Sequence, residues 1–271
     1  MDDILARHNV RVTGRPDGRP VMFAHGFGCD QNMWRFVAPA FEDEFRVVLF
    51  DQAGAGGADP AAYDPARHAS LHGYAEDVVS ICRALEARDV VFVGHSVSSM
   101  IGALAALAEP DRFARLVMVS PSPRYIDDEG YVGGFSATDI RELLDSLDSN
   151  YLGWSSAMAP MIMGNPERPE LAGELTDSFC RTDPQIARRF AEVTFTSDNR
   201  ADLPRVQTPT LVLQCAQDAI APVSVGRYVA EAMPHASLVL LDATGHCPNL
   251  SAPEETVAAI APFIRDGRLV G

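Results

Sequence analysis

Short apolar runs recur along the chain, and segments with a helical periodicity lie between them. The strand-sized runs are VMFA (21–24), RVVLF (46–50), VVFV (90–93), LVMV (116–119), TLVLQC (210–215) and SLVLLD (237–242). Mainly apolar strands of this kind are typical of a sheet that is covered on both faces, and therefore of a mostly parallel sheet. The helical patterns occupy residues 71–87, 97–108 and 253–265. This alternation predicts an α/β fold in which helices flank the sheet.

The alternation stops between Ser120 and about Arg205, where no strand pattern occurs. Residues 151–163 and 185–195 are instead helical in pattern, and they are rich in aromatic residues and methionine. We expect an all-helical cap inserted between two strands; ordinary crossover helices are the alternative, but the interval is long for them. The predicted organisation is a first core segment, a cap and a second core segment, at residues 1–121, 122–205 and 206–271.

Charge and cysteine content narrow the possible partners and compartment. Lysine and arginine number 22 against 37 acidic residues, a formal charge of −15, so a nucleic-acid partner is not expected. No apolar run is long enough to span a bilayer, and the first ten residues lack the pattern of a secretion signal. The five cysteines are scattered without C-x-x-C spacing, which predicts reduced thiols, a cytoplasmic location and no structural metal.

The glycine-rich stretch DQAGAGGAD (51–59) follows a predicted strand, as a dinucleotide-binding turn does. The dinucleotide fingerprint needs a small residue at the position of Asp59, where an acid would face the pyrophosphate. We therefore interpret this stretch as a surface turn and expect no cofactor.

Three residues carry the candidate chemistry. Ser96 lies within GHSVS, between the run VVFV and a helical pattern that begins near Val97. A sharp strand-to-helix turn projects such a serine above the sheet, although the usual motif G-x-S-x-G has glycine where this chain has Ser98. Asp218 and His246 each follow a predicted strand, and the order serine, acid, histidine is that of a nucleophile, an orienting acid and a general base. Asp242 is the alternative acid, but it more simply ends a strand.

The loop HGFG (25–28) follows the run VMFA, and its glycines allow a backbone amide to face a developing oxyanion. We expect the amides of Phe27 and Val97 to form that oxyanion site. His95 adjoins the nucleophile, and we expect it to pack or hydrogen-bond beside the pocket. The large apolar residues of the cap are expected to enclose an apolar pocket over Ser96.

Several longer stretches resemble one family across nearly the whole chain. They are HGFGCDQNMW (25–34), FVGHSVSSMIG (92–102), YVGGF (131–135), FCRTDPQIARRFA (179–191) and LQCAQDAIAP (213–222). These resemble the RsbQ-like α/β-hydrolases, which include a bacterial stress-response regulator, and they are similar to the plant strigolactone and karrikin receptors. In that group serine is familiar at the place of Ser98.

The resemblance implies an α/β-hydrolase fold with a four-helix, V-shaped cap, and the same triad and oxyanion amides. It also implies a substrate pocket lined by Tyr125, Phe135, Trp154 and Phe195. We expect His95, beside the nucleophile, and Met158, in the cap, to line the same pocket.

Two functions follow as hypotheses. The first is a cofactor-free serine hydrolase that acts on a small apolar ester or lactone; a cofactor-free haloperoxidase would share the same triad. The second, which rests on the resemblance, is a signalling regulator in a stress response. Such a protein would sense a ligand through slow hydrolysis and activate a serine/threonine phosphatase that carries a PAS domain.

Overall fold

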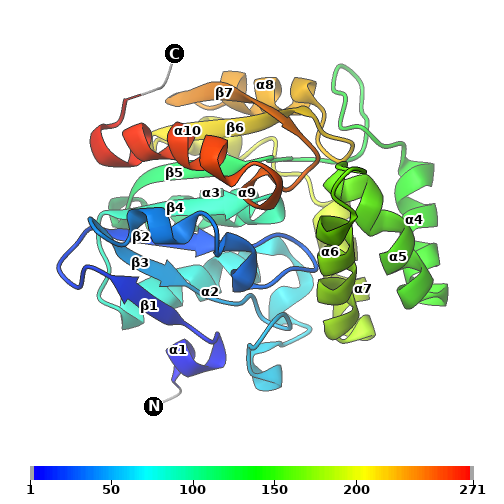
Figure 1. The fold of residues 1–271 in the computed structure, drawn as a ribbon, viewed down its shortest axis with the longest axis horizontal. Coiled ribbons are helices and arrows are strands. Elements are labelled where there is room, and N and C mark those ends of the chain that lie inside the picture. The colour runs from blue at the N-terminus through cyan, green and yellow to red at the C-terminus, as the bar shows by residue number, and fades with distance from the viewer. Residues whose placement is uncertain (1–2, 269–271) are drawn as a thin grey trace.

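A computed structural model describes residues 3–268 of the chain, with a seven-stranded sheet at its centre (Figure 1). The strand order across the sheet is β1-β3-β2-β4-β5-β6-β7, and every neighbouring pair is parallel except β1 and β3. The strands are β1 (Arg11–Gly14), β2 (Pro20–Ala24), β3 (Arg46–Leu49), β4 (Val90–His95), β5 (Phe113–Val119), β6 (Thr210–Gln217) and β7 (Ala236–Thr244).

All six predicted strands are present, and the prediction of a mostly parallel α/β sheet is confirmed. β1 was not predicted. Its four residues are all exposed, so it carries no apolar pattern, and it pairs along the sheet edge with β3 in the antiparallel sense.

Helices cover both faces of the sheet and also form a separate group. The core helices are α1 (Ile4–Arg7), α2 (Leu71–Ala84), α3 (Val97–Ala108), α8 (Val223–Ala232), α9 (Pro248–Ser251) and α10 (Pro253–Asp266). Short 3-10 helices lie at Gln31–Trp34, Ala38–Phe41, Pro60–Ala62, Arg67–Ala69, Pro110–Arg112 and Leu203–Arg205. Among residues 3–268, no helix combines the length and the apolar character that crossing a membrane would require.

Alternation along the strands divides the core into two layers. On β4, Val91 and Val93 face the layer that contains Ile260 of α10, whereas Val90 and Phe92 face the layer that contains α2 and α3. Successive side chains of a strand point to opposite faces, so a continuous apolar run fills both layers at once.

Four helices lie between β5 and β6 in the chain: α4 (Ala137–Ser149), α5 (Tyr151–Met163), α6 (Pro169–Arg181) and α7 (Pro184–Thr196). They stand together at one end of the sheet in Figure 1. Their sequences explain them locally: Ser136 and Asp139 form a capping box at the start of α4, and Gly164 ends α5 in the left-handed conformation. We call α4–α7 the cap.

Candidate active site

Ser96 occupies a sharp turn between β4 and α3. Its backbone has φ 56° and ψ −124°, a conformation that residues with a side chain rarely adopt. The turn is held because the Ser96 amide donates a 2.8 Å hydrogen bond to the Val119 carbonyl of β5. Strand and helix pass so closely that a Cβ atom on Gly94 would lie 2.4 Å from the Ser98 carbonyl oxygen.

The structure joins Ser96, His246 and Asp218 in one hydrogen-bonded chain. The Oγ of Ser96 lies 2.8 Å from Nε2 of His246, and Nδ1 of His246 lies 2.8 Å from Oδ2 of Asp218. A carboxylate only accepts, so Nδ1 carries the proton and Nε2 is free to accept from the serine. The three residues follow β4, β6 and β7, so the parallel sheet brings their loops to the same edge.

The side chain of Asp218 is buried and remains ionised. Burial alone would raise its pKa, but His246 and the amides of Ile220 and Ala221 outweigh that effect and lower it. Both amides donate to Oδ1, at 2.8 and 3.0 Å, which leaves Oδ2 directed at the histidine. The acid is therefore fixed in position and in charge, as an orienting group for a histidine must be.

Phe27 and Val97 both lie beside Ser96. Phe27 is in the turn after β2 and lines the same cavity as the serine, and within residues 3–268 its amide has no hydrogen-bond acceptor. The Val97 amide belongs to the first turn of α3, where helix amides lack acceptors within the helix. Gly28, at φ 69°, lies so close to Phe179 that an added Cβ would be 2.0 Å from its ring.

A cavity of about 30 Å³ lies over Ser96 under the cap, enough for one or two water molecules. Five of the six predicted pocket residues line it: His95, Tyr125, Trp154, Met158 and Phe195. Further lining residues were not predicted as such: Cys29, Ile162, Leu175, Phe179, Thr194, Ile220 and Cys247. Leu175 and Phe179 are four residues apart on α6, so the helical spacing of that segment was the signal that could have found them.

The sixth pocket prediction, Phe135, is wrong, because this residue does not line the cavity. Its backbone is held in a loop that folds back on itself: the Phe135 amide donates to the Tyr125 carbonyl, and its carbonyl accepts from Asp127. The half-buried ring packs against the core cluster instead.

Tyr125 and His95 are polar neighbours of Ser96 and His246. The Tyr125 hydroxyl lies 3.4 Å from Ser96 Oγ, and burial raises its pKa, so it stays protonated. His95 donates from Nε2 to the carbonyl of His246 at 2.7 Å. Burial, together with the nearby His246, lowers the pKa of His95 to about 3, so it is neutral at pH 7. The prediction that His95 hydrogen-bonds beside the pocket agrees with this contact.

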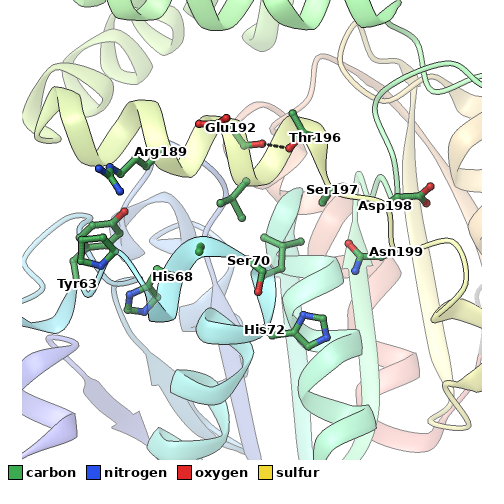
Figure 2. Close-up of a pocket in the computed structure, with 14 residues that line it drawn as sticks. Tyr63, His68, Ser70, His72, Arg189, Glu192, Thr196, Ser197, Asp198 and Asn199 are labelled. Atoms are coloured by element: carbon green, nitrogen blue, oxygen red, sulfur yellow. Dashed lines mark hydrogen bonds between the residues drawn. The ribbon is translucent and has the colours of Figure 1, made fainter.

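A roomier cleft of about 470 Å³ lies elsewhere, between α7 and the loop that precedes α2 (Figure 2). Its lining is polar, with Tyr63 and His72 facing Arg189 and Glu192 across it. Its other histidine, His68, is already bonded to the buried Asp77 at 2.8 Å. Ser96 does not line this cleft, so its size does not make it the reaction site.

In residues 3–268, no cluster of three or more histidine, cysteine or acidic side chains is arranged to hold a metal ion. The polar groups that the candidate site presents are a hydroxyl, an imidazole, a carboxylate and backbone amides, and these are the groups that acyl transfer through a serine uses.

The comparisons with known proteins agree with this geometry. Residues 21–260 match the alpha/beta hydrolase family. The chain is 37% identical to the "Karrikin insensitive 2 receptor CA" of Petunia hybrida, covering 97% of this chain and 98% of the receptor. It is 36% identical to a strigolactone esterase of Pisum sativum, covering 92% of this chain and 94% of the esterase. A solved hydrolase from Oleispira antarctica superposes with a TM-score of 0.95 at 42% identity, over 98% of this chain and 97% of that one.

Proposed function

The chain belongs to the alpha/beta hydrolase family, and from that premise we propose that it hydrolyses a small apolar ester or lactone. Ser96 is the nucleophile, His246 the general base and Asp218 the acid that orients the histidine. The observation that carries the proposal is the continuous chain of two 2.8 Å hydrogen bonds through these three residues.

The reaction has two halves. His246 Nε2 takes the proton from Ser96 Oγ as the oxygen attacks the carbonyl carbon, and the amides of Phe27 and Val97 hold the oxyanion. The imidazolium, stabilised by Asp218, then donates its proton to the departing alkoxide oxygen. In the second half His246 deprotonates a water molecule, which attacks the acyl-serine, and the proton returns to Ser96 as the acid is released.

The cavity supports a small acyl group. Phe27, Trp154 and Phe195 give it an apolar wall, and its volume of about 30 Å³ leaves no room for a bulky acyl chain. Phe27 joins core and cap, because its ring lies 5.7 to 6.1 Å from four cap rings: Trp154, Phe179, Phe190 and Phe195. A larger substrate would have to separate these rings before it reached Ser96.

The test is the hydrolysis of p-nitrophenyl acetate and of a simple butenolide by the wild type and by Ser96→Ala. We expect the variant to lose about 10⁴-fold or more of kcat, as serine hydrolases do when the nucleophile is removed. Mass spectrometry of the wild type should show an acyl group on the peptide that contains Ser96. Equal turnover by both proteins would mean that the nucleophile is a different group.

A second candidate function is a ligand sensor in signalling. The small cavity under the cap favours it, because a ligand that must separate the cap rings to reach Ser96 would be hydrolysed slowly, and slow turnover suits a sensor. A similar protein of Petunia hybrida is named as a receptor. In this form of the proposal, a stress-response partner such as a phosphatase with a PAS domain would dock on the protein in the cytoplasm. The five free cysteines of the chain suit that reducing compartment.

The sensor function predicts a partner that distinguishes ligand states. The measurement is binding of a purified PAS-domain phosphatase to wild type and to Ser96→Ala, with and without a butenolide. Ligand-dependent binding that Ser96→Ala abolishes would support the sensor. Rapid turnover of an ester together with no binding in any state would leave simple hydrolysis as the function.

A further inference from the structure

Ser98 does more than fit the place where the usual motif has glycine. Its side chain is completely buried, and its hydroxyl makes two hydrogen bonds. It donates to the carbonyl oxygen of His25 at 2.5 Å and accepts from Nε2 of Gln52 at 3.0 Å. A glycine at this position could make neither bond, so the serine connects the first turn of α3 to the loop that carries the candidate oxyanion amide of Phe27.

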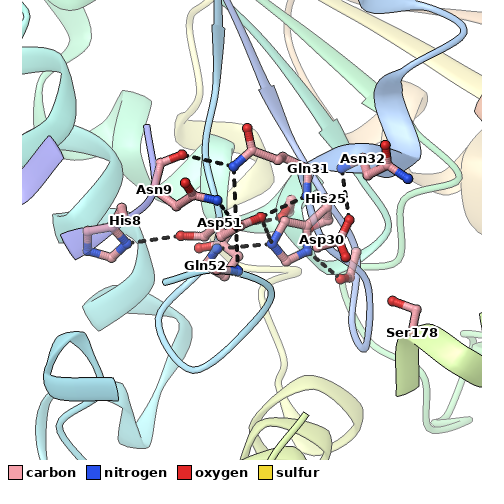
Figure 3. A network of polar contacts seen from close by, with 12 residues as sticks. His8, Asn9, His25, Asp30, Gln31, Asn32, Asp51, Gln52 and Ser178 are labelled. Carbon is pink, nitrogen blue, oxygen red and sulfur yellow. Dashed lines mark hydrogen bonds and ion pairs between the residues drawn. The ribbon is translucent and has the colours of Figure 1, made fainter. Parts of the chain in front are cut away.

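Gln52 holds the same loop from a second direction. Its backbone amide donates to Nε2 of His25 at 3.0 Å (Figure 3). An amide can only donate, so Nε2 of His25 carries no proton and Nδ1 does. Nδ1 donates in turn to the carbonyl oxygen of Gly26 at 2.9 Å.

These bonds restrain two successive carbonyls of the oxyanion loop, those of His25 and Gly26. The Gly26 carbonyl and the Phe27 amide belong to one planar trans peptide, so they point in opposite directions. Holding the carbonyl oxygen against His25 therefore fixes the direction of the Phe27 N–H. A carbonyl that accepts a hydrogen bond also makes the N–H of its own peptide a stronger donor.

Asp51, the residue before Gln52, holds this part of the chain in place through hydrogen bonds. Asp51 accepts from the side chain of Asn9 and from the amides of Gln31 and Gly57, at 2.7 to 2.8 Å. Burial opposes its charge, but the hydrogen bonds from Asn9, Gln31 and Gly57 lower its pKa. The hydrogen bonds of this buried, ionised neighbour fix the position of Gln52. Gln52 can therefore hold His25 and Ser98 in place.

We propose that Ser98 and Gln52 are positioning residues that aim the Phe27 amide at the oxyanion. The proposal rests on the proposed hydrolase function, and it gives the serine of GHSVS a role in the reaction that is separate from Ser96. Neither side chain touches the substrate; both act through His25 and the peptide that follows it.

The experiment compares Ser98→Ala, Ser98→Gly and Gln52→Met, which removes the side-chain donor but keeps the backbone amide. Ser99→Ala is the matched control, because Ser99 is also buried but donates to the Gly94 carbonyl at 2.9 Å, away from the oxyanion loop. We expect both Ser98 variants to lower kcat for p-nitrophenyl acetate about 10- to 100-fold with KM within about twofold, less than removal of a whole oxyanion donor. The fall in kcat should be smaller in Gln52→Met, and Ser99→Ala should keep kcat within about twofold.

A boronic acid gives a second readout, since its tetrahedral adduct on Ser96 mimics the oxyanion. Its affinity should fall in the Ser98 variants by the same factor as kcat/KM. Ser98 variants that keep wild-type kcat and boronate affinity, or a Ser99→Ala variant that loses as much, would overturn the proposal. If the wild type shows no hydrolysis that depends on Ser96, the proposed function fails instead. Crystal structures then decide the positioning role, since an unmoved 25–28 loop in Ser98→Ala would contradict it.

Discussion

The amide of His246 donates a 2.8 Å hydrogen bond to the carbonyl of Ile162, so the candidate base is tied directly to cap helix α5. Asn165 strengthens the tie, because its Nδ2 donates to the carbonyl of Met163 at 2.6 Å and to that of Thr244 at 2.8 Å. There is no spare room at this joint: a Cβ atom on Gly245 would lie 1.9 Å from the Met163 carbonyl oxygen. A displacement of α5 would therefore move the backbone of the base.

Asn165→Ala should loosen that joint. We expect about a tenfold fall in kcat for p-nitrophenyl acetate and a loss of about 1–2 kcal/mol in the free energy of unfolding, since the two hydrogen bonds across the joint disappear together with one that Arg168 donates to Oδ1 of Asn165. Asn150→Ala is the control, because Asn150 caps the other end of α5 by accepting from the Gly153 amide. The control should lose similar stability and keep its kcat. Parallel losses of kcat in both variants would show that α5 matters only for stability.

Asp218→Asn should leave the fold intact and remove most of the activity. An amide nitrogen in place of Oδ2 would donate toward Nδ1 of His246 and favour the wrong tautomer, so kcat should fall about 10⁴-fold. Steady-state kinetics with p-nitrophenyl acetate and a circular dichroism spectrum check the two parts. A fall in kcat of less than about tenfold would instead indicate that another acid orients His246, and Asp242→Asn is the comparison to make.

His95 should make the fold sensitive to acid. Its pKa of about 3 in the folded protein lies below the ordinary value near 6.5, so between these values only the unfolded chain binds the proton. The free energy of unfolding therefore falls as the pH drops below 6.5, by about 2 kcal/mol at pH 5. His95→Gln, measured by urea unfolding at pH 7 and pH 5, should show a drop smaller by that amount. Equal drops in both proteins would contradict a neutral buried His95.

The cavity should select for short acyl chains. Along p-nitrophenyl acetate, butyrate and octanoate, kcat/KM should fall at least tenfold, because the longer chains must displace cap side chains. Met158→Ala, which removes part of the cavity wall, should raise kcat/KM for the butyrate ester more than for the other esters. An octanoate ester that the wild type hydrolyses as well as the acetate would show that the cap opens without cost.

Much of this arrangement could be predicted from the sequence. The buried strands were predicted because apolar runs report burial on both faces, and the triad because its members each follow such a strand. β1 could not be predicted, since a fully exposed edge strand has no apolar pattern. The bonds of Ser98 were also out of reach, because they join three segments, near residues 25, 52 and 98, whose approach depends on the whole sheet.

The backbone of Ser96 has one more consequence, for the balance between stability and function. A residue with a side chain at φ 56° and ψ −124° carries a conformational penalty of about 1–3 kcal/mol, which glycine largely avoids. Ser96→Gly should therefore unfold at a higher temperature than Ser96→Ala in a calorimetric comparison, although both lack the nucleophile. Glycine at this position would give a more stable fold, but it has no side chain that could act as a nucleophile. Selection for thermal stability alone would therefore remove the reactive serine.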